Sequence, residues 1–160
     1  MNYFFTALML ACCAYAFAGG GAPERIGAAI FLIGSVLTYV TLEISPIDFR
    51  GVEVGVFIID VVTFAVFILL AVRANRFWPL WMSALLGLGV VGHLAMLLQP
   101  HVIPWAYAVV LSIWSYPILL LIATGTHCHQ RRLKGNGADP SWTPSSAPPG
   151  PPMPPPGPKP

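Results

Sequence analysis

Long apolar segments, separated by short breaks, dominate this chain of 160 residues. Five of them approach or reach the roughly 17–25 residues that a helix needs to cross a bilayer. They cover about 3–18, 26–42, 54–72, 78–98 and 105–123. Gly- and Pro-rich connections this short force consecutive segments to run antiparallel. Only helices satisfy their own backbone in hydrocarbon at this length, so the sequence predicts an all-α membrane protein, an up-and-down bundle of five transmembrane helices over residues 1–126.

Composition narrows the function classes. Hydrophobic residues make up 56% of the chain and charged residues 9%, against about 25% charged residues in soluble domains. The few basic residues lie beside apolar segments, so no nucleic-acid partner is expected. The predicted partner is the lipid bilayer, together with another copy of the chain or a different membrane protein.

The placement of the basic residues predicts the orientation. Side chains that fall on one side of five alternating spans are Arg25, Arg73, Arg76, Arg131, Arg132 and Lys134. The opposite side holds Arg50 among three carboxylates. Because basic residues concentrate in cytoplasmic loops, the N-terminus is expected outside and the C-terminus in the cytoplasm. Phe77, Trp78 and Trp81 are expected to form an aromatic belt at the cytoplasmic face.

The first apolar segment has a second interpretation. Ala16-Phe17-Ala18 followed by glycine resembles a signal-peptidase site. Against cleavage, no Lys or Arg precedes the apolar core, and removal of the segment would invert every later loop. An uncleaved span is favoured, and cleavage stays open as the alternative.

The C-terminal part differs in composition from the rest. Residues 127–160 begin with a basic stretch and continue as a Pro-rich run of low complexity. Such a run cannot bury apolar surface. The sequence predicts a disordered cytoplasmic tail over these residues.

Asp60 is an ionisable residue within an otherwise apolar segment, which is a costly placement. Counted along the helices at 1.5 Å per residue, it lies about 9 Å below the outer surface, and His93 on the next segment lies about 8 Å below it. We predict an intramembrane Asp60–His93 pair, with Glu53 and Thr63 as supporting residues. The pair has two interpretations: a polar contact that fixes helix packing, which is favoured, or a site that handles a proton or cation.

The other motifs in the sequence do not indicate a binding or catalytic site. Gly87-Leu-Gly-Val-Val-Gly92 matches a dinucleotide fingerprint in letters only, because no βαβ unit surrounds it, and a helix-packing face is the better interpretation. His127-Cys128-His129 lacks further ligands for a metal. No second histidine suits haem ligation with His93, and no serine has a nucleophile setting. The sequence predicts no cofactor, no metal site and no enzyme activity.

The runs Arg76-Phe-Trp-Pro-Leu-Trp81 and Trp114-Ser-Tyr-Pro117, with the five-span layout, resemble a set of small bacterial inner-membrane proteins of unknown function. The likeness covers about residues 1–132 and implies a location in the bacterial inner membrane. It brings no functional residue with it. The expected function is that of a non-enzymatic accessory or structural membrane component; the alternative is a small proton- or cation-coupled transporter or channel component that uses Asp60 and His93.

Overall fold

The computed structural model describes residues 3–44, 54–98, 109 and 113–142, and these residues are helical apart from short turns. The named helices are α1 (Tyr3–Gly19), α2 (Ala22–Ile44), α3 (Val54–Arg73), α4 (Trp78–Leu98) and α6 (Ser115–Asn136). The all-helical class predicted from the sequence is confirmed for this part of the chain. Three of the helices, α2, α3 and α4, are long and apolar enough to cross a membrane, while α1 is a shorter apolar helix of 17 residues.

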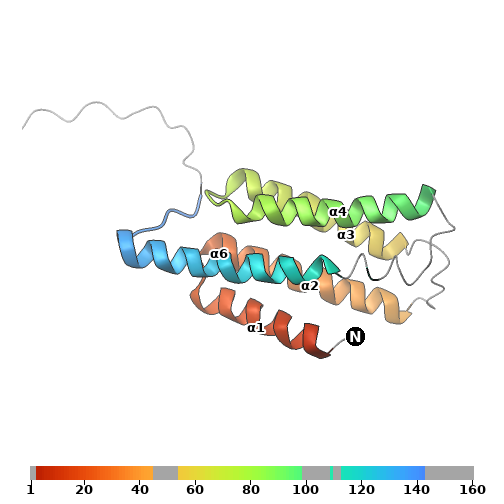
Figure 1. Ribbon diagram of the computed structural model, residues 1–160, viewed down its shortest axis with the longest axis horizontal. Helices are drawn as coiled ribbons and strands as arrows, with labels where there is room; N and C mark the ends of the chain where they lie inside the picture. The colour runs from red at the N-terminus through yellow and green to blue at the C-terminus, as the bar shows by residue number, and fades with distance from the viewer. Residues whose placement is uncertain (1–2, 45–53, 99–108, 110–112, 143–160) are drawn as a thin grey trace, which may run out of the picture.

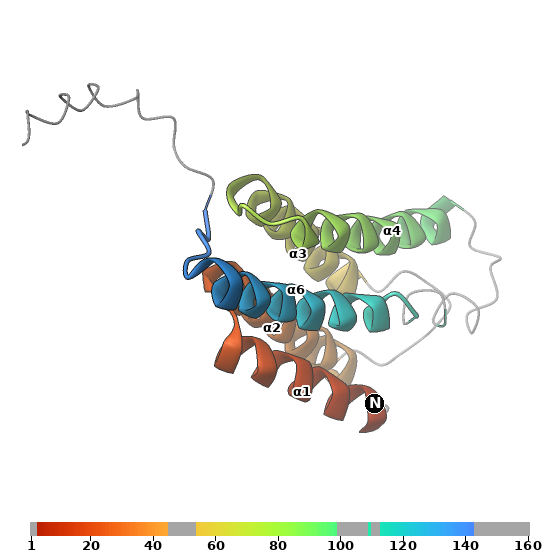
Figure 2. The ribbon, with the colours of Figure 1, turned by 60° about the vertical axis from the view of Figure 1, so that its left-hand side comes forward.

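The helices form an elongated bundle in which each one packs against the next (Figure 1). In chain order α1 to α4 are neighbours, and α6 closes the ring by packing against both α4 and α1. A contact between α2 and α6 crosses the ring. Figure 2 shows α3 and α4 side by side, with α6 and α2 between that pair and α1.

Two tight connections and the end of α6 lie together at one end of the bundle (Figures 1 and 2). We call this the Glu24 end, after a residue described below. Each helix that begins here does so with a proline in its first turn, Pro23 in α2 and Pro79 in α4. The missing N–H of proline has no helical acceptor to lose at that position, so these residues start helices at little cost.

The predicted boundaries of the first four segments agree with the helices to within a few residues. The fifth does not agree. Residues 99–108 and 110–112 lie outside the described part, and α6 continues 13 residues beyond Ala123 to Asn136. Predicted disorder from residue 127 is therefore wrong over the stretch to Asn136. The Pro-rich run after residue 142 lies outside the described residues.

Gly137 ends α6 and turns the chain back toward the bundle. Its φ is 72°, and its N–H donates to the carbonyl of Leu133 at 3.0 Å. This left-handed conformation is easy for glycine and closes the last turn of a helix. The next five residues, Ala138–Trp142, lie against the connection between α3 and α4; we call them the strap.

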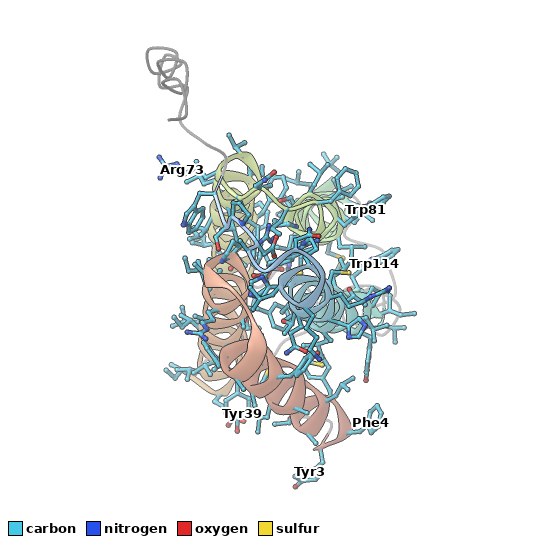
Figure 3. All side chains as sticks on the ribbon, turned by 90° about the vertical axis from the view of Figure 1, so that its left-hand side faces the viewer. Tyr3, Phe4, Tyr39, Arg73, Trp81 and Trp114 are labelled. Carbon is cyan, nitrogen blue, oxygen red and sulfur yellow. The ribbon has the colours of Figure 1, made fainter. Side chains whose placement is uncertain are left out.

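The exterior of the bundle is rich in large apolar side chains, as a lipid-facing surface requires. Viewed from the Glu24 end in Figure 3, Tyr3, Phe4, Tyr39 and Trp81 all point outward. Phe77 and Trp81, two of the residues predicted to form an aromatic belt, are exposed. Trp78 is an exception that corrects the prediction, because it is only 7% exposed and points into the bundle.

Candidate functional site

The predicted Asp60–His93 pair is brought together by α3 and α4. His93 Nε2 lies 3.0 Å from Asp60 Oδ2. The imidazole is almost fully buried, whereas 32% of the Asp60 side chain is exposed. The Phe57 ring, one turn earlier on α3, packs against the imidazole with the ring centroids 5.5 Å apart. The arrangement is a carboxylate at the rim of the bundle with a histidine behind it.

The supporting residues have other roles or cannot be placed. Thr63 is buried, and its hydroxyl donates to the carbonyl of Ile59 at 2.7 Å, within its own helix. A side chain at Gly34 of α2 would meet the Thr63 hydroxyl at 3.2 Å, so Thr63 marks a close approach of α2 to α3. Glu53 lies outside the described residues. Of the predicted residues that the structure describes, Asp60 and His93 therefore bond each other, and Thr63 bonds within its own helix.

The glycine face predicted on α4 is smaller than expected. A Cβ at Gly87 would lie 3.2 Å from the Phe64 ring of α3, which makes this glycine part of the helix contact. Gly89 faces open space, with no atom of the described residues within 4 Å of its added Cβ. The expected close approach beside Gly89 does not occur in the described part.

A second polar cluster occupies the Glu24 end. None of the sequence patterns described above predicted it. Glu24, in the first turn of α2, is 0% exposed. Its Oε1 accepts hydrogen bonds from Trp78 Nε1 at 3.0 Å and from Arg76 Nε at 3.3 Å. The α2 N-terminus also favours a negative side chain, because the helix dipole is positive there. A buried carboxylate is thus balanced by a guanidinium that is itself 3% exposed.

Trp78 reaches Glu24 because two glycines give its indole room. A Cβ at Gly125 of α6 would lie 2.8 Å from Trp78 Cδ1, and a Cβ at Gly27 of α2 would overlap Cη2 of the same ring. The indole therefore lies directly against the backbones of two helices. Any residue larger than glycine at positions 27 and 125 would occupy the space of the ring. This packing explains why Trp78 is not part of an exterior belt.

Arg76 is the hub of the cluster. A guanidinium has five N–H donors, and each one of Arg76 has an acceptor. Nε bonds Glu24, Nη1 bonds the carbonyls of Asn75 and Pro140, and Nη2 bonds both the carbonyl and the carboxylate of Asp139. Three of these acceptors belong to the strap. A lysine ammonium has neither the number nor the planar arrangement of donors to make these five hydrogen bonds.

Asp139 is the counterpart of Arg76 on the strap. Its Oδ2 lies 2.7 Å from Arg76 Nη2 and 2.6 Å from His129 Nδ1, and its Oδ1 lies 3.1 Å from Arg132 Nε. Burial raises the pKa of Asp139, but the hydrogen bonds from His129 and Arg132 and the charges of Arg76 and Arg132 outweigh burial, so the pKa falls below its ordinary value. The carboxylate is ionised at neutral pH.

Two atoms of this cluster are buried without a hydrogen-bond partner among the described residues: Glu24 Oε2 and Arg132 Nη2. Glu24 Oε2 lies beside Gly21, where an added Cβ would be 2.9 Å from it and 3.0 Å from His129 Cε1. Arg132 Nη2 belongs to a guanidinium whose Nε already bonds Asp139. The donors and acceptors of the cluster are therefore not fully matched.

The sequence held a signal for this second cluster. If helices alternate in direction, Glu24 and Arg76 fall at the same end, by the same counting that pairs Asp60 with His93. The third partner, Asp139, could not be predicted, because the composition around residue 139 indicates a disordered tail.

His127, Cys128 and His129 follow one another around α6. Within the described residues, no group of three or more potential ligands converges on a metal position.

Both clusters join helices through charged or polar side chains, one within the apolar part and one at the Glu24 end. Chemically, the first can hold or exchange a proton, and the second can hold an anion among guanidinium groups. No protein-family model, curated protein or solved structure matches this chain.

Proposed function

We propose that this protein is a non-enzymatic accessory or structural component of the bacterial inner membrane. It crosses the membrane five times, with its N-terminus outside and the Glu24 end in the cytoplasm. The basic residues of the described part support this orientation, because Arg25, Arg73, Arg131 and Lys134 all lie at the Glu24 end. A disordered Pro-rich segment follows the strap in this proposal.

One observation carries the structural role: the ionisable side chains inside the bundle bond to each other across helices. Asp60 of α3 bonds His93 of α4, and Glu24 of α2 bonds Arg76 and Trp78. Contacts of this kind fix the register and rotation of neighbouring helices, and each side chain offsets the desolvation of the other.

The alternative is a small proton- or cation-coupled transporter or channel component. The specific observation that favours it is the exposure of Asp60, whose side chain is 32% exposed although it lies within an apolar helix. An ionisable group at the rim, with a buried imidazole behind it, is a suitable acceptor for a proton or a cation.

Two substitutions of Asp60 separate the proposals. Asp60→Asn keeps a hydrogen-bonding side chain opposite His93, whereas Asp60→Leu removes it. For a structural role, Asp60→Asn accumulates in the membrane like the wild type, while Asp60→Leu melts at a lower temperature in mild detergent. The Asp60–His93 coupling in a double-mutant cycle is expected at about 0.6 kcal/mol and below about 1.7 kcal/mol.

The readout for transport is the tolerance of the host to ion, metal and pH stress. A phenotype of Asp60→Asn equal to that of a deletion, with normal accumulation and melting, would refute the structural role and support the alternative. Normal tolerance in both variants would refute the transporter.

A further inference from the structure

At the Glu24 end, Arg76, His129 and Arg132 of the bundle all bond one carboxylate, that of Asp139. Arg76 is held by Glu24 through Nε and by the carbonyl of Asn75 through Nη1. His129 and Arg132 are three residues apart on α6, and both bond the same carboxylate. Residues at this spacing share a face of a helix. The donors belong to the bundle, and only the acceptor, Asp139, belongs to the strap.

The carboxylate of Asp139 does not use every donor around it. Its two oxygens already accept from Arg76, His129 and Arg132, while Arg132 Nη2 stays buried without an acceptor among the described residues. A phosphate group carries three acceptor oxygens and binds guanidinium groups in a forked geometry. It offers one oxygen more than the carboxylate does.

The strap is attached mainly by polar contacts. Ala138, Pro140 and Trp142 are exposed. The strap is held by the Asp139 carboxylate and by the carbonyls of Asp139 and Pro140, which accept hydrogen bonds from the Arg76 side chain. The Asn75 N–H also donates to the carbonyl of Ser141. A segment with little buried apolar surface can open locally while the helices stay folded. Its release leaves Arg76 buried beside a vacated acceptor position, which strongly favours a replacement anion.

We propose that Arg76, His129 and Arg132 form a binding site for a phosphate group, and that Asp139 is its built-in competing occupant. The phosphate belongs either to the headgroup of a membrane lipid or to a soluble phosphate compound, since the donors recognise the group common to both. The site lies beyond the apolar part of α6. In the orientation proposed above, on which this step rests, that position is at the level of the lipid headgroups. Ligand binding and strap attachment exclude each other.

The test compares wild-type protein with Asp139→Ala, both full length and in maltoside detergent with chloride as the only other anion. The probes are inorganic phosphate, short-chain phosphatidic acid, and diacylglycerol of the same chain length as the phosphate-free control. Because an intramolecular competitor acts at millimolar effective concentration, its removal is expected to tighten phosphate-group binding about tenfold or more in calorimetry. Tight binding of phosphatidic acid alone identifies a headgroup site, and tight binding of inorganic phosphate identifies a soluble ligand.

Two second-site variants on the Asp139→Ala background control for general charge. Arg132→Gln removes a donor of the site, and Arg131→Gln removes the adjacent, exposed charge of the same helix. Loss of binding in Arg132→Gln alone supports the site. Equal loss in both, equal binding of diacylglycerol, or no tightening in Asp139→Ala overturns it.

A measurement on the intact cluster covers the case in which Asp139→Ala fails to fold. A spin label at Ala138→Cys, in a Cys128→Ser background, reports the mobility of the strap. Added phosphate or phosphatidic acid is expected to convert the label from an immobile to a mobile spectrum, with diacylglycerol inactive. An unchanged spectrum at saturating concentrations of both phosphate probes would overturn the proposal.

Discussion

Arg76 shows how much a single side chain decides at the Glu24 end. It joins the first turn of α2, the connection before α4 and the strap through all five of its donors. The buried carboxyl groups of Glu24 and Asp139 both lie against its charge. Lysine has the same charge but fewer donors in a different geometry. It cannot bond the first turn of α2, the connection before α4 and the strap in the same way.

Arg76→Lys is therefore expected to destabilise the protein although it conserves charge. An ammonium has three donors, so at least two acceptors lose their partner, at about 1.5–3 kcal/mol for each bond to a charged group. The measurement is thermal unfolding in mild detergent. Arg131→Lys, at an exposed position of α6, is the matched control, and an equal effect of the two changes would contradict the central role of Arg76.

The pKa of Asp139 predicts how strap attachment depends on pH. The groups that face Asp139 are Arg76 before α4 and His129 and Arg132 on α6, with Glu24 of α2 on the far side of Arg76. Because the folded pKa is lowered, attachment is fully favoured above the unfolded value of about 3.9 and is lost as the pH falls through the folded value.

The expected outcome is a strap that stays attached throughout the neutral range and is released only below about pH 4. Spin-label mobility at Ala138→Cys, followed from pH 7 downward, measures it. In Asp139→Ala the label should be mobile at every pH. A wild-type transition near pH 6 would show that a different group controls attachment.

At the scale of the helices, the lengths of the apolar segments and the Gly- and Pro-rich connections between them were sufficient to predict α1 to α4. They also predicted the antiparallel pairing that brings Asp60 to His93. The end of α6 was not predictable from hydropathy, because residues 127–136 are polar and are held by contacts rather than by lipid. His129 and Arg132 bond Asp139, and Gln130 bonds both Tyr15 and the carbonyl of Gly19. These partners lie up to 115 residues away, beyond any local pattern.

The position of Trp78 was missed for a related reason. An aromatic residue at a helix end is typical of a membrane interface, and only the two facing glycines show that this one is inserted instead. Gly27 and Gly125 come from different helices, and their common neighbour appears only once α2, α4 and α6 are packed.

Gly27→Ala and Gly125→Ala are expected to destabilise the bundle, each by about 1–3 kcal/mol, because an added methyl meets the Trp78 ring in a tightly packed interior. Gly89→Ala is the control on α4, where the added Cβ has open space, and it should be neutral or stabilising by up to about 1 kcal/mol. Melting temperatures in detergent measure all three. Tolerance of both Gly27→Ala and Gly125→Ala would contradict the insertion of the indole.

For the whole molecule, the strap is part of the folded unit rather than the beginning of a tail. It supplies three acceptors to Arg76 and the carboxylate that His129 and Arg132 bind. The folded unit therefore extends at least to Trp142, beyond the boundary at residue 127 that composition indicates.

Two truncations test this boundary. A chain that ends at Trp142 keeps every bond of the strap and should melt close to the full-length protein. A chain that ends at Asn136 leaves the buried guanidinium of Arg76 without a strap carboxylate and should lose about 3–5 kcal/mol of stability. Equal melting of the two truncated proteins would contradict the structural role of the strap.

The distances in sequence between these partners also set an order of events during synthesis. Glu24 meets Arg76 only after 52 further residues have been made, and Arg76 meets Asp139 only after another 63. A nascent chain thus carries first a carboxylate without this partner and then a guanidinium without its strap acceptors, until the residues after α6 have been made. Products of incomplete translation therefore keep charged groups that the finished chain pairs.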